Sequence, residues 1–133
     1  AAPTYVKRWG VPDHPGDLND HSLILGPASR GTEGWSFRRS GKVVSVRVHG
    51  RFVVSASEAA TAAAVAGLGI LSTGYGSVRN ELSDGTLLRV LPDWEIGVSD
   101  INIILPAGRA AKASARAFAD FIAAEVKNSE YQP

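Results

Sequence analysis

Residues 50–74 constrain the fold most, because they predict two strands joined by one helix. The bulky residues of 52–54 favour a buried strand, and residues 69–71 favour a second one. The helix between them, expected over 56–66, is almost entirely alanine, the strongest helix former. Such small side chains allow a helix to lie very close to a sheet.

Residues at both ends of this helix carry signals for its boundaries. Ser55 stands three positions before Glu58, the spacing of a capping box, so we expect the helix to begin at Ala56. Gly67 follows its last alanine and supplies the residue that adopts a left-handed conformation at a helix end.

The start of this helix is also a natural place for a ligand. Ligands of open α/β sheets bind outside the carboxyl ends of the strands, and a helix N-terminus offers free N–H donors to an anion. We therefore expect a binding edge near Ser55 and Ser57. The alternative is that both serines only cap the helix.

Composition narrows the class of protein. The chain has 133 residues, 44% of them hydrophobic and 20% charged, which suits one globular domain or one domain and a fragment. Its net charge of +1 provides no electrostatic footprint for nucleic acid, so we expect no direct DNA contact. The absence of cysteine excludes a disulfide scaffold and a thiol nucleophile and is compatible with a cytoplasmic location.

No part of the sequence approaches the ~20 continuous apolar residues that a membrane span needs. We expect a soluble protein without membrane contact. The chain begins at Ala1 without methionine or a signal-peptide pattern, so we interpret it as a fragment of a longer protein.

The remaining elements alternate between helix and strand. We expect further helices over 3–9, 75–82 and 109–127, and strands over 22–25, 35–39, 42–48, 86–91 and 101–105. Ser40-Gly41 is a two-residue hairpin signal between the strands on either side. This order predicts an α/β fold with a mainly parallel sheet and one antiparallel hairpin.

Several short patterns together resemble the effector-binding domain of LysR-type transcriptional regulators. In order they are Ala2-Pro3-Thr4-Tyr5-Val6 with Gly10, Pro12, Pro15, Asp17-Leu18 and His21; Trp35-x-Phe37 with Gly41-Lys42; Ala66-Gly67-Leu68-Gly69-Ile70; Leu82-x-x-Gly85-x-Leu87-x-x-Val90-Leu91-Pro92-x-Trp94; and Pro106 with Arg109 and Arg116-Ala117-Phe118-x-Asp120-Phe121-Ile122. Each piece alone is weak, but their order and spacing over the whole chain are specific.

The resemblance implies a type 2 periplasmic-binding-protein-like half-domain. Residues 1–90 would form the second subdomain, and residues 91–133 a strand and a C-terminal helix that return to an incomplete first subdomain. Members of the family bind a small effector between the subdomains, which changes promoter binding by a separate helix-turn-helix domain. That domain and the first half of the first subdomain are absent from this sequence.

The resemblance also implies which residues face the effector. They lie at the end of one strand with the following helix start, and at the end of the next strand: Val54, Ser55, Ala56, Ser57, Leu71, Ser72 and Thr73. Hydroxyls and free N–H groups suit a small carboxylate or polar aromatic ligand. The alternative is that all seven are caps and strand ends.

Catalytic and metal-binding functions have little support. Three histidines, His14, His21 and His49, stand among many serines and aspartates, but no Gly-x-Ser-x-Gly elbow is present. The histidines lack the spacing of metal ligands. Gly67 and Gly69 follow a helix and precede a strand, the reverse of a dinucleotide fingerprint. We therefore expect no enzyme, metal or cofactor, with His14 at the surface and His21 fixing a turn.

Contacts between chains are a further expectation, since effector domains of the resembling family pair. We predict exposed apolar surface around 101–105 and on the Phe118 and Phe121 side of the last helix, and a homo-oligomer. A basic patch on the hairpin is more typical of a solvated face, and it consists of Arg38, Arg39, Lys42 and Arg47. The alternative function is a free-standing α/β module for interaction or small-ligand binding without a regulatory role.

Overall fold

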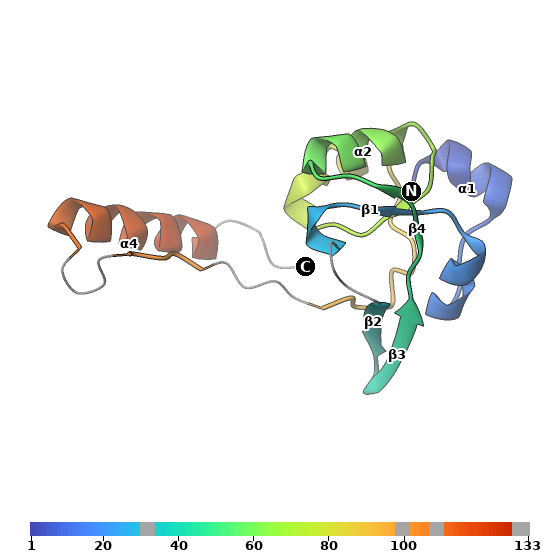
Figure 1. Cartoon of the computed structure of the whole chain (residues 1–133), viewed down its shortest axis with the longest axis horizontal. Helices are drawn as coiled ribbons and strands as arrows, with labels where there is room; N and C mark the ends of the chain where they lie inside the picture. Colours follow the sequence, from blue (N-terminus) through green and yellow to red (C-terminus); the bar gives the residue numbers. More distant parts are fainter. Residues whose placement is uncertain (30–33, 98–101, 107–110, 129–133) are drawn as a thin grey trace. The chain divides into compact units, whose positions relative to one another are not determined.

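The computed structural model describes residues 1–29, 34–97, 102–106 and 111–128 (Figure 1). The chain forms two compact units, Ala1–Val98 and Ser99–Pro133. The boundary expected at residue 90 concerns subdomains of a larger fold and stays a prediction.

A three-stranded parallel sheet lies at the centre of the first unit. Its strands are β1 (Leu23–Leu25), β4 (Gly50–Val53) and β5 (Ile70–Leu71), in the order β4-β1-β5. Both outer strands run parallel to β1, which confirms the predicted parallel sheet.

Helix α2 (Ser57–Val65) connects β4 to β5 but begins later than predicted. The N-cap is Ala56, and no side chain forms a capping hydrogen bond. The expected capping box of Ser55 and Glu58 is therefore wrong. A Ser-x-x-Glu spacing caps a helix only when the serine itself occupies the N-cap position, and here the extended backbone continues one residue further.

The other end of α2 matches the prediction. Gly67 has a left-handed φ of 74°. The backbone N–H of Gly67 donates to Ala64, and the N–H of Leu68 donates to Ala63, the two hydrogen bonds of a Schellman motif. Ala60 and Ala64 of this helix are buried, as expected for a helix packed closely on a sheet.

Two short helical elements precede the sheet. Helix α1 (Pro3–Trp9) forms as predicted, with proline in its first turn and Gly10 at its end. The 3-10 helix η1 (Pro15–Asp20) is capped by the exposed His14, whose Nδ1 accepts a hydrogen bond from the backbone N–H of Gly16. A second 3-10 turn, η2 (Pro27–Ser29), follows β1.

The antiparallel hairpin of β2 (Gly34–Arg39) and β3 (Lys42–Arg47) is confirmed. Ser40 and Gly41 have φ angles of 47° and 80°, as a type I′ turn requires. Trp35, Phe37 and Val46 are buried on one face of the hairpin.

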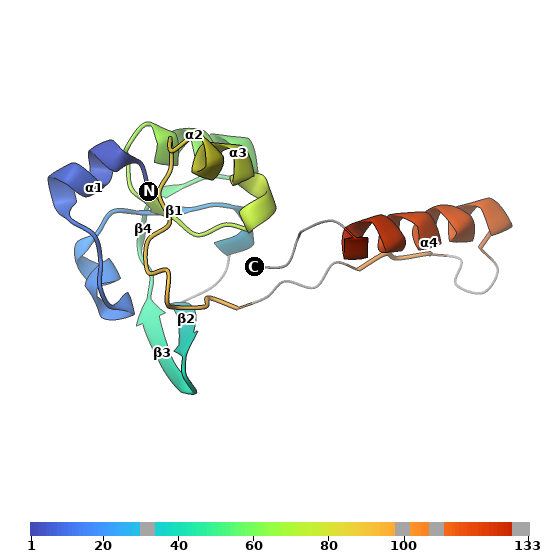
Figure 2. The ribbon, with the colours of Figure 1, turned by 180° about the vertical axis from the view of Figure 1, so that it is seen from behind.

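The predicted helix over 75–82 divides in the structure. The 3-10 turn η3 (Tyr75–Ser77) and helix α3 (Arg79–Ser83) are separated at Val78. Val78 is nevertheless buried in the same cluster as Ala60 and Ala64. Figure 2 shows α3 beside α2 on that side of the sheet.

The strand expected over 86–91 is wrong. This segment is irregular, and it bonds through its backbone to the first residue of the chain, where the N–H of Leu88 donates to Ala1. Leu91 has a positive φ of 53°, which ends any extended run. A β-prone segment forms a strand only where a neighbouring strand offers a complete ladder.

The core lies on both faces of the parallel sheet. Leu23 and Ile24 are consecutive on β1 and therefore point to opposite faces. Leu23 belongs to a cluster with Trp35 and Trp94, whereas Ile24 belongs to a cluster with Ala64. The hairpin and Tyr5 of α1 thus pack with Leu23, whereas α2 and α3 pack with Ile24.

The second unit contains helix α4 (Ala113–Asn128), in agreement with the predicted helix within its described part. Residues 102–105 do not form the expected strand, and Ile101 lies outside the described residues. Among the described residues of this unit, four large apolar side chains are exposed, as predicted: Ile103, Ile104, Phe118 and Phe121. None of the helices in the described part of the chain is long and apolar enough to cross a bilayer.

Candidate functional site

The seven predicted effector residues lie at one edge of the parallel sheet. Because β4, β1 and β5 run in the same direction, their carboxyl ends meet at the same edge. The backbone N–H of Val54 donates to Leu25 at 3.0 Å, which ties the end of β4 to the end of β1. Residues 55–57 lead into α2 and are exposed, whereas Leu71 at the end of β5 and the next two residues are half-buried.

The middle strand supplies a third part of this edge that the sequence interpretation missed. Gly26 follows β1 and is buried, and a Cβ at this position would lie 3.2 Å from the Cβ of Ala60. It would also lie 3.9 Å from Cδ1 of Leu71. Because Gly26 has no side chain, α2 and β5 can pack closely against the end of β1. The sequence signal for this contribution was Leu25-Gly26-Pro27, in which a residue without a side chain follows a short apolar strand.

Several polar groups of this edge have no hydrogen-bond partner in the described part of the chain. Within the described residues, the hydroxyls of Ser55, Ser57, Ser72 and Thr73 form no hydrogen bonds. The first backbone N–H groups of α2 also lack an intrahelical acceptor, as at every helix start, and Ala56 provides no side-chain cap. The edge can thus donate several hydrogen bonds to an acidic or polar ligand.

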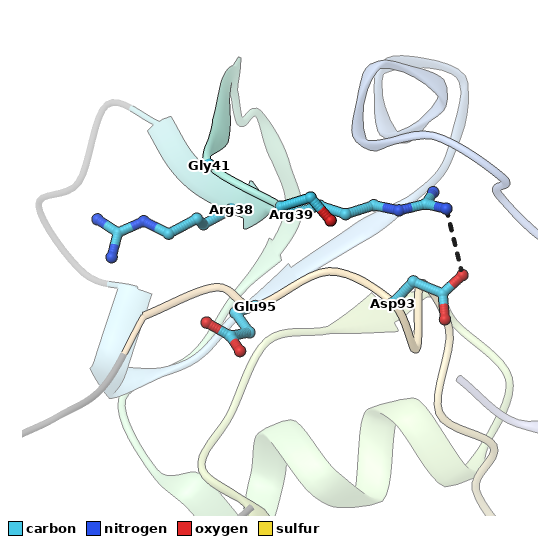
Figure 3. Close-up of a pocket in the computed structure, with 6 residues that line it drawn as sticks. Arg38, Arg39, Gly41, Asp93 and Glu95 are labelled. Carbon is cyan, nitrogen blue, oxygen red and sulfur yellow. Dashed lines mark ion pairs between the residues drawn. The ribbon is translucent and has the colours of Figure 1, made fainter.

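Two hollows of the first unit lie away from this edge. The larger, about 430 Å³, lies between the hairpin turn and the segment after Leu91 (Figure 3). Its lining residues are Arg38, Arg39, Ser40, Gly41, Asp93 and Glu95. The smaller lies at the amino-terminal end of the sheet. The predicted residues line neither of these two hollows.

The arginines of the hairpin hollow lie close to acidic residues, and Arg39 forms an ion pair with one of them. Arg39 lies 3.9 Å from a carboxylate oxygen of Asp93 and stacks over the Trp94 ring at 5.7 Å. Arg38 exchanges both backbone hydrogen bonds with Glu95, so the two side chains lie on the same side of the ladder. Two carboxylates thus offset the two guanidinium groups, and this exposed surface is not an anion site.

Titratable groups elsewhere have structural roles. The side-chain hydroxyl and backbone N–H of Thr86 lower the pKa of Asp84, in a turn after α3. His21 contacts the Tyr5 hydroxyl at 3.1 Å and fixes the entry to β1, as predicted for a turn-fixing residue. Within the described ranges, no cluster of three or more His, Asp or Glu residues could hold a metal ion.

Comparison with known proteins identifies the family. The model of the LysR substrate binding domain matches residues 1–127. The chain belongs to this family. The predicted type 2 periplasmic-binding-protein-like fold is therefore confirmed.

A curated relative supports the same assignment. The probable HTH-type transcriptional regulator LtrA of Klebsiella pneumoniae is 30% identical over 129 residues. The match covers 95% of this chain but 42% of the regulator, so the chain spans about two fifths of the length of such relatives.

Solved regulatory domains share the fold. The regulatory domain of AphB from Vibrio vulnificus is 28% identical and superposes with a TM-score of 0.69 over 94% of this chain and 62% of its own. The regulatory domain of CrgA, a LysR-type regulator of Neisseria meningitidis, has a TM-score of 0.72 over 94% of this chain and 61% of its own. At 24% identity, CrgA is evidence for the fold alone.

Proposed function

We propose that this chain is the effector-binding part of a LysR-type transcriptional regulator, with one wall of the effector site at the carboxyl edge of β4, β1 and β5. The observation that carries the proposal is the group of unused hydroxyls and helix N–H donors at that edge. In a domain of this family, such unpaired polar groups are suited to hydrogen-bonding a small ligand and not to packing in the hydrophobic core.

The ligand is a small carboxylate or a polar aromatic molecule. Its acidic group accepts hydrogen bonds from the start of α2 and from the hydroxyls of Ser55 and Ser57. Ser72 and Thr73 donate from the end of β5, while Val54, Ala56 and Leu71 form the apolar part of the wall. No buried countercharge is needed, because several dipoles share the negative charge.

The site requires a second wall. We assign residues 1–90 to the second subdomain and residues 91–133 to a return segment of the first, whose remaining part closes over the ligand in the complete regulator. Binding between the two subdomains then changes how a separate helix-turn-helix domain holds a promoter. This role is cytoplasmic and requires no catalytic step.

The exposed apolar residues of the second unit fit this assignment. Ile103, Ile104, Phe118 and Phe121 are the side chains that a complete first subdomain or a second chain would cover. We therefore propose that the regulator is a homo-oligomer.

A thermal-shift experiment tests the proposed site. The full-length regulator is heated with a panel of small carboxylates and aromatic compounds, and a ligand that binds the folded state raises the melting temperature. The Ser55→Ala, Ser57→Ala double variant should lose the ligand-induced shift. Its own unfolding free energy should change by no more than about 0.5 kcal/mol, because neither hydroxyl caps α2.

A second double variant is the matched control. Ser36→Ala with Ser45→Ala also removes two hydroxyls, but these bond to each other on the hairpin at 3.1 Å. This variant should keep the ligand-induced shift. Unchanged ligand affinity in the Ser55, Ser57 variant would exclude these serines from the site.

A further inference from the structure

The smaller hollow of the first unit has a volume of about 220 Å³ and lies at the amino-terminal end of the sheet. Its walls are α1, the turn from η1 into β1, and the beginning of β4. It is therefore at the opposite end of the strands from the proposed effector edge. Its side chains carry both signs of charge and an aromatic surface.

Arg51 enters this hollow from an irregularity in β4. Leu23 pairs with Gly50 and Ile24 pairs with Phe52, so Arg51 has no partner on β1 and forms a β-bulge. Bulges redirect side chains and are frequent beside binding sites. Within the described part of the chain, the Arg51 guanidinium forms no ion pair or hydrogen bond.

His21 is held beside this arginine by Tyr5. The Tyr5 oxygen accepts a hydrogen bond from the Ser22 backbone N–H at 2.9 Å and lies 3.1 Å from Nδ1 of His21. This contact occupies Nδ1 and fixes the orientation of the His21 ring, so Nε2 is the ring nitrogen that remains for a ligand. The imidazole is thus a second, preoriented polar group of the hollow.

The other lining groups differ from those of a simple anion site. Asp20 contributes a carboxylate that has no ion-pair partner within the described residues, and Asn19 lies next to it. Trp9 is 56% exposed, and the Arg8 guanidinium covers one face of its ring at 5.3 Å. The hollow thus combines cationic, anionic and aromatic surfaces within the space of a small molecule.

We propose that this hollow is a second small-molecule site that binds a zwitterion of the α-amino acid class. Arg51 and His21 donate to its carboxylate, Asp20 accepts from its ammonium group, and Trp9 contacts an apolar side chain. A ligand with both charges satisfies Arg51 and Asp20 at once, whereas a ligand with one charge leaves the other group unpaired. The site does not depend on the proposed effector edge.

Nuclear magnetic resonance of the indole N–H groups tests this site in the 133-residue chain. L-Phenylalanine should shift the resonance of Trp9, while those of the buried Trp35 and Trp94 should not move. 3-Phenylpropionate lacks the ammonium group and phenethylamine lacks the carboxylate, so both should bind at least about tenfold more weakly. No shift of Trp9 with L-phenylalanine would overturn the proposal, and equal affinity for 3-phenylpropionate would overturn the role of Asp20.

Variants separate this site from other surfaces. Arg51→Gln should weaken L-phenylalanine binding about tenfold or more, while the matched change Arg47→Gln, at an exposed arginine of β3, should not alter it. The Ser55→Ala, Ser57→Ala variant should also bind L-phenylalanine normally. Unchanged affinity in Arg51→Gln would overturn the proposal, whether or not the effector site exists.

Discussion

Gly69 is a residue at which only a hydrogen atom fits, because a Cβ would overlap the backbone carbonyl oxygen of Ser22. The same carbonyl oxygen accepts the backbone N–H of Ile70 at 2.8 Å, which aligns β5 with β1. A larger residue at 69 would therefore push apart two strands whose ends form the proposed effector edge.

We predict that Gly69→Ala lowers the free energy of unfolding by about 1–3 kcal/mol, the usual cost of overpacking a rigid contact. Gly74→Ala is the matched control, because a Cβ added at Gly74 would meet no atom within 4 Å and the φ of this residue is −67°. Urea denaturation measures both values. Equal stability of the two variants would contradict the close approach of β5 to β1.

Single residues were predictable where local chemistry alone decides the conformation. Gly67 at the end of α2 and Ser40-Gly41 in the hairpin turn belong to this class. The capping box was not predictable, because Ser55 has the correct spacing but the backbone enters the helix one residue later. The contribution of Gly26 depends on Ala60, a contact between residues far apart in the sequence.

Helix α2 is the element that follows β4 at the proposed effector edge. Its buried residues are Ala60, Thr61 and Ala64, all with small side chains, and Ala64 is fully buried. The short distance between helix and sheet depends on these small side chains, since a protein interior has no space for extra methylene groups.

We predict that Ala64→Leu lowers the free energy of unfolding by about 1–3 kcal/mol, because the larger side chain must displace the sheet. Ala62→Leu places the same group on the exposed face of the same helix and should change stability by less than about 0.5 kcal/mol. Thermal or urea unfolding distinguishes them. A neutral Ala64→Leu would show that the helix is not closely packed.

Secondary-structure elements were predictable where the hydrophobic period is long or where the pairing strand is adjacent in the sequence. The hairpin and α4 are of this kind. The segments 86–91 and 102–105 have β-prone composition, but neither pairs with a strand in the described part of the chain. Residues 86–91 instead form a single backbone pair with Ala1, a contact that depends on tertiary structure.

On the scale of the whole molecule, the chain consists of one unit with a complete core and a second unit with exposed apolar side chains. The residues of both core clusters precede position 95, within Ala1–Val98. The order of motifs in the sequence predicted the family correctly, because the fold of a LysR substrate-binding domain imposes that order. The sequence alone did not predict that the carboxyl ends of β4, β1 and β5 meet at one edge, because that depends on strand pairing between distant segments.

Hydrogen–deuterium exchange of the full-length regulator, with a ligand that raises its melting temperature, tests the effector edge most directly. We predict that the ligand slows amide exchange over residues 54–59 and 71–74, because it binds to the N–H groups at the start of α2 and to the strand ends. A ligand that stabilises the protein while exchange in both segments stays unchanged would contradict it.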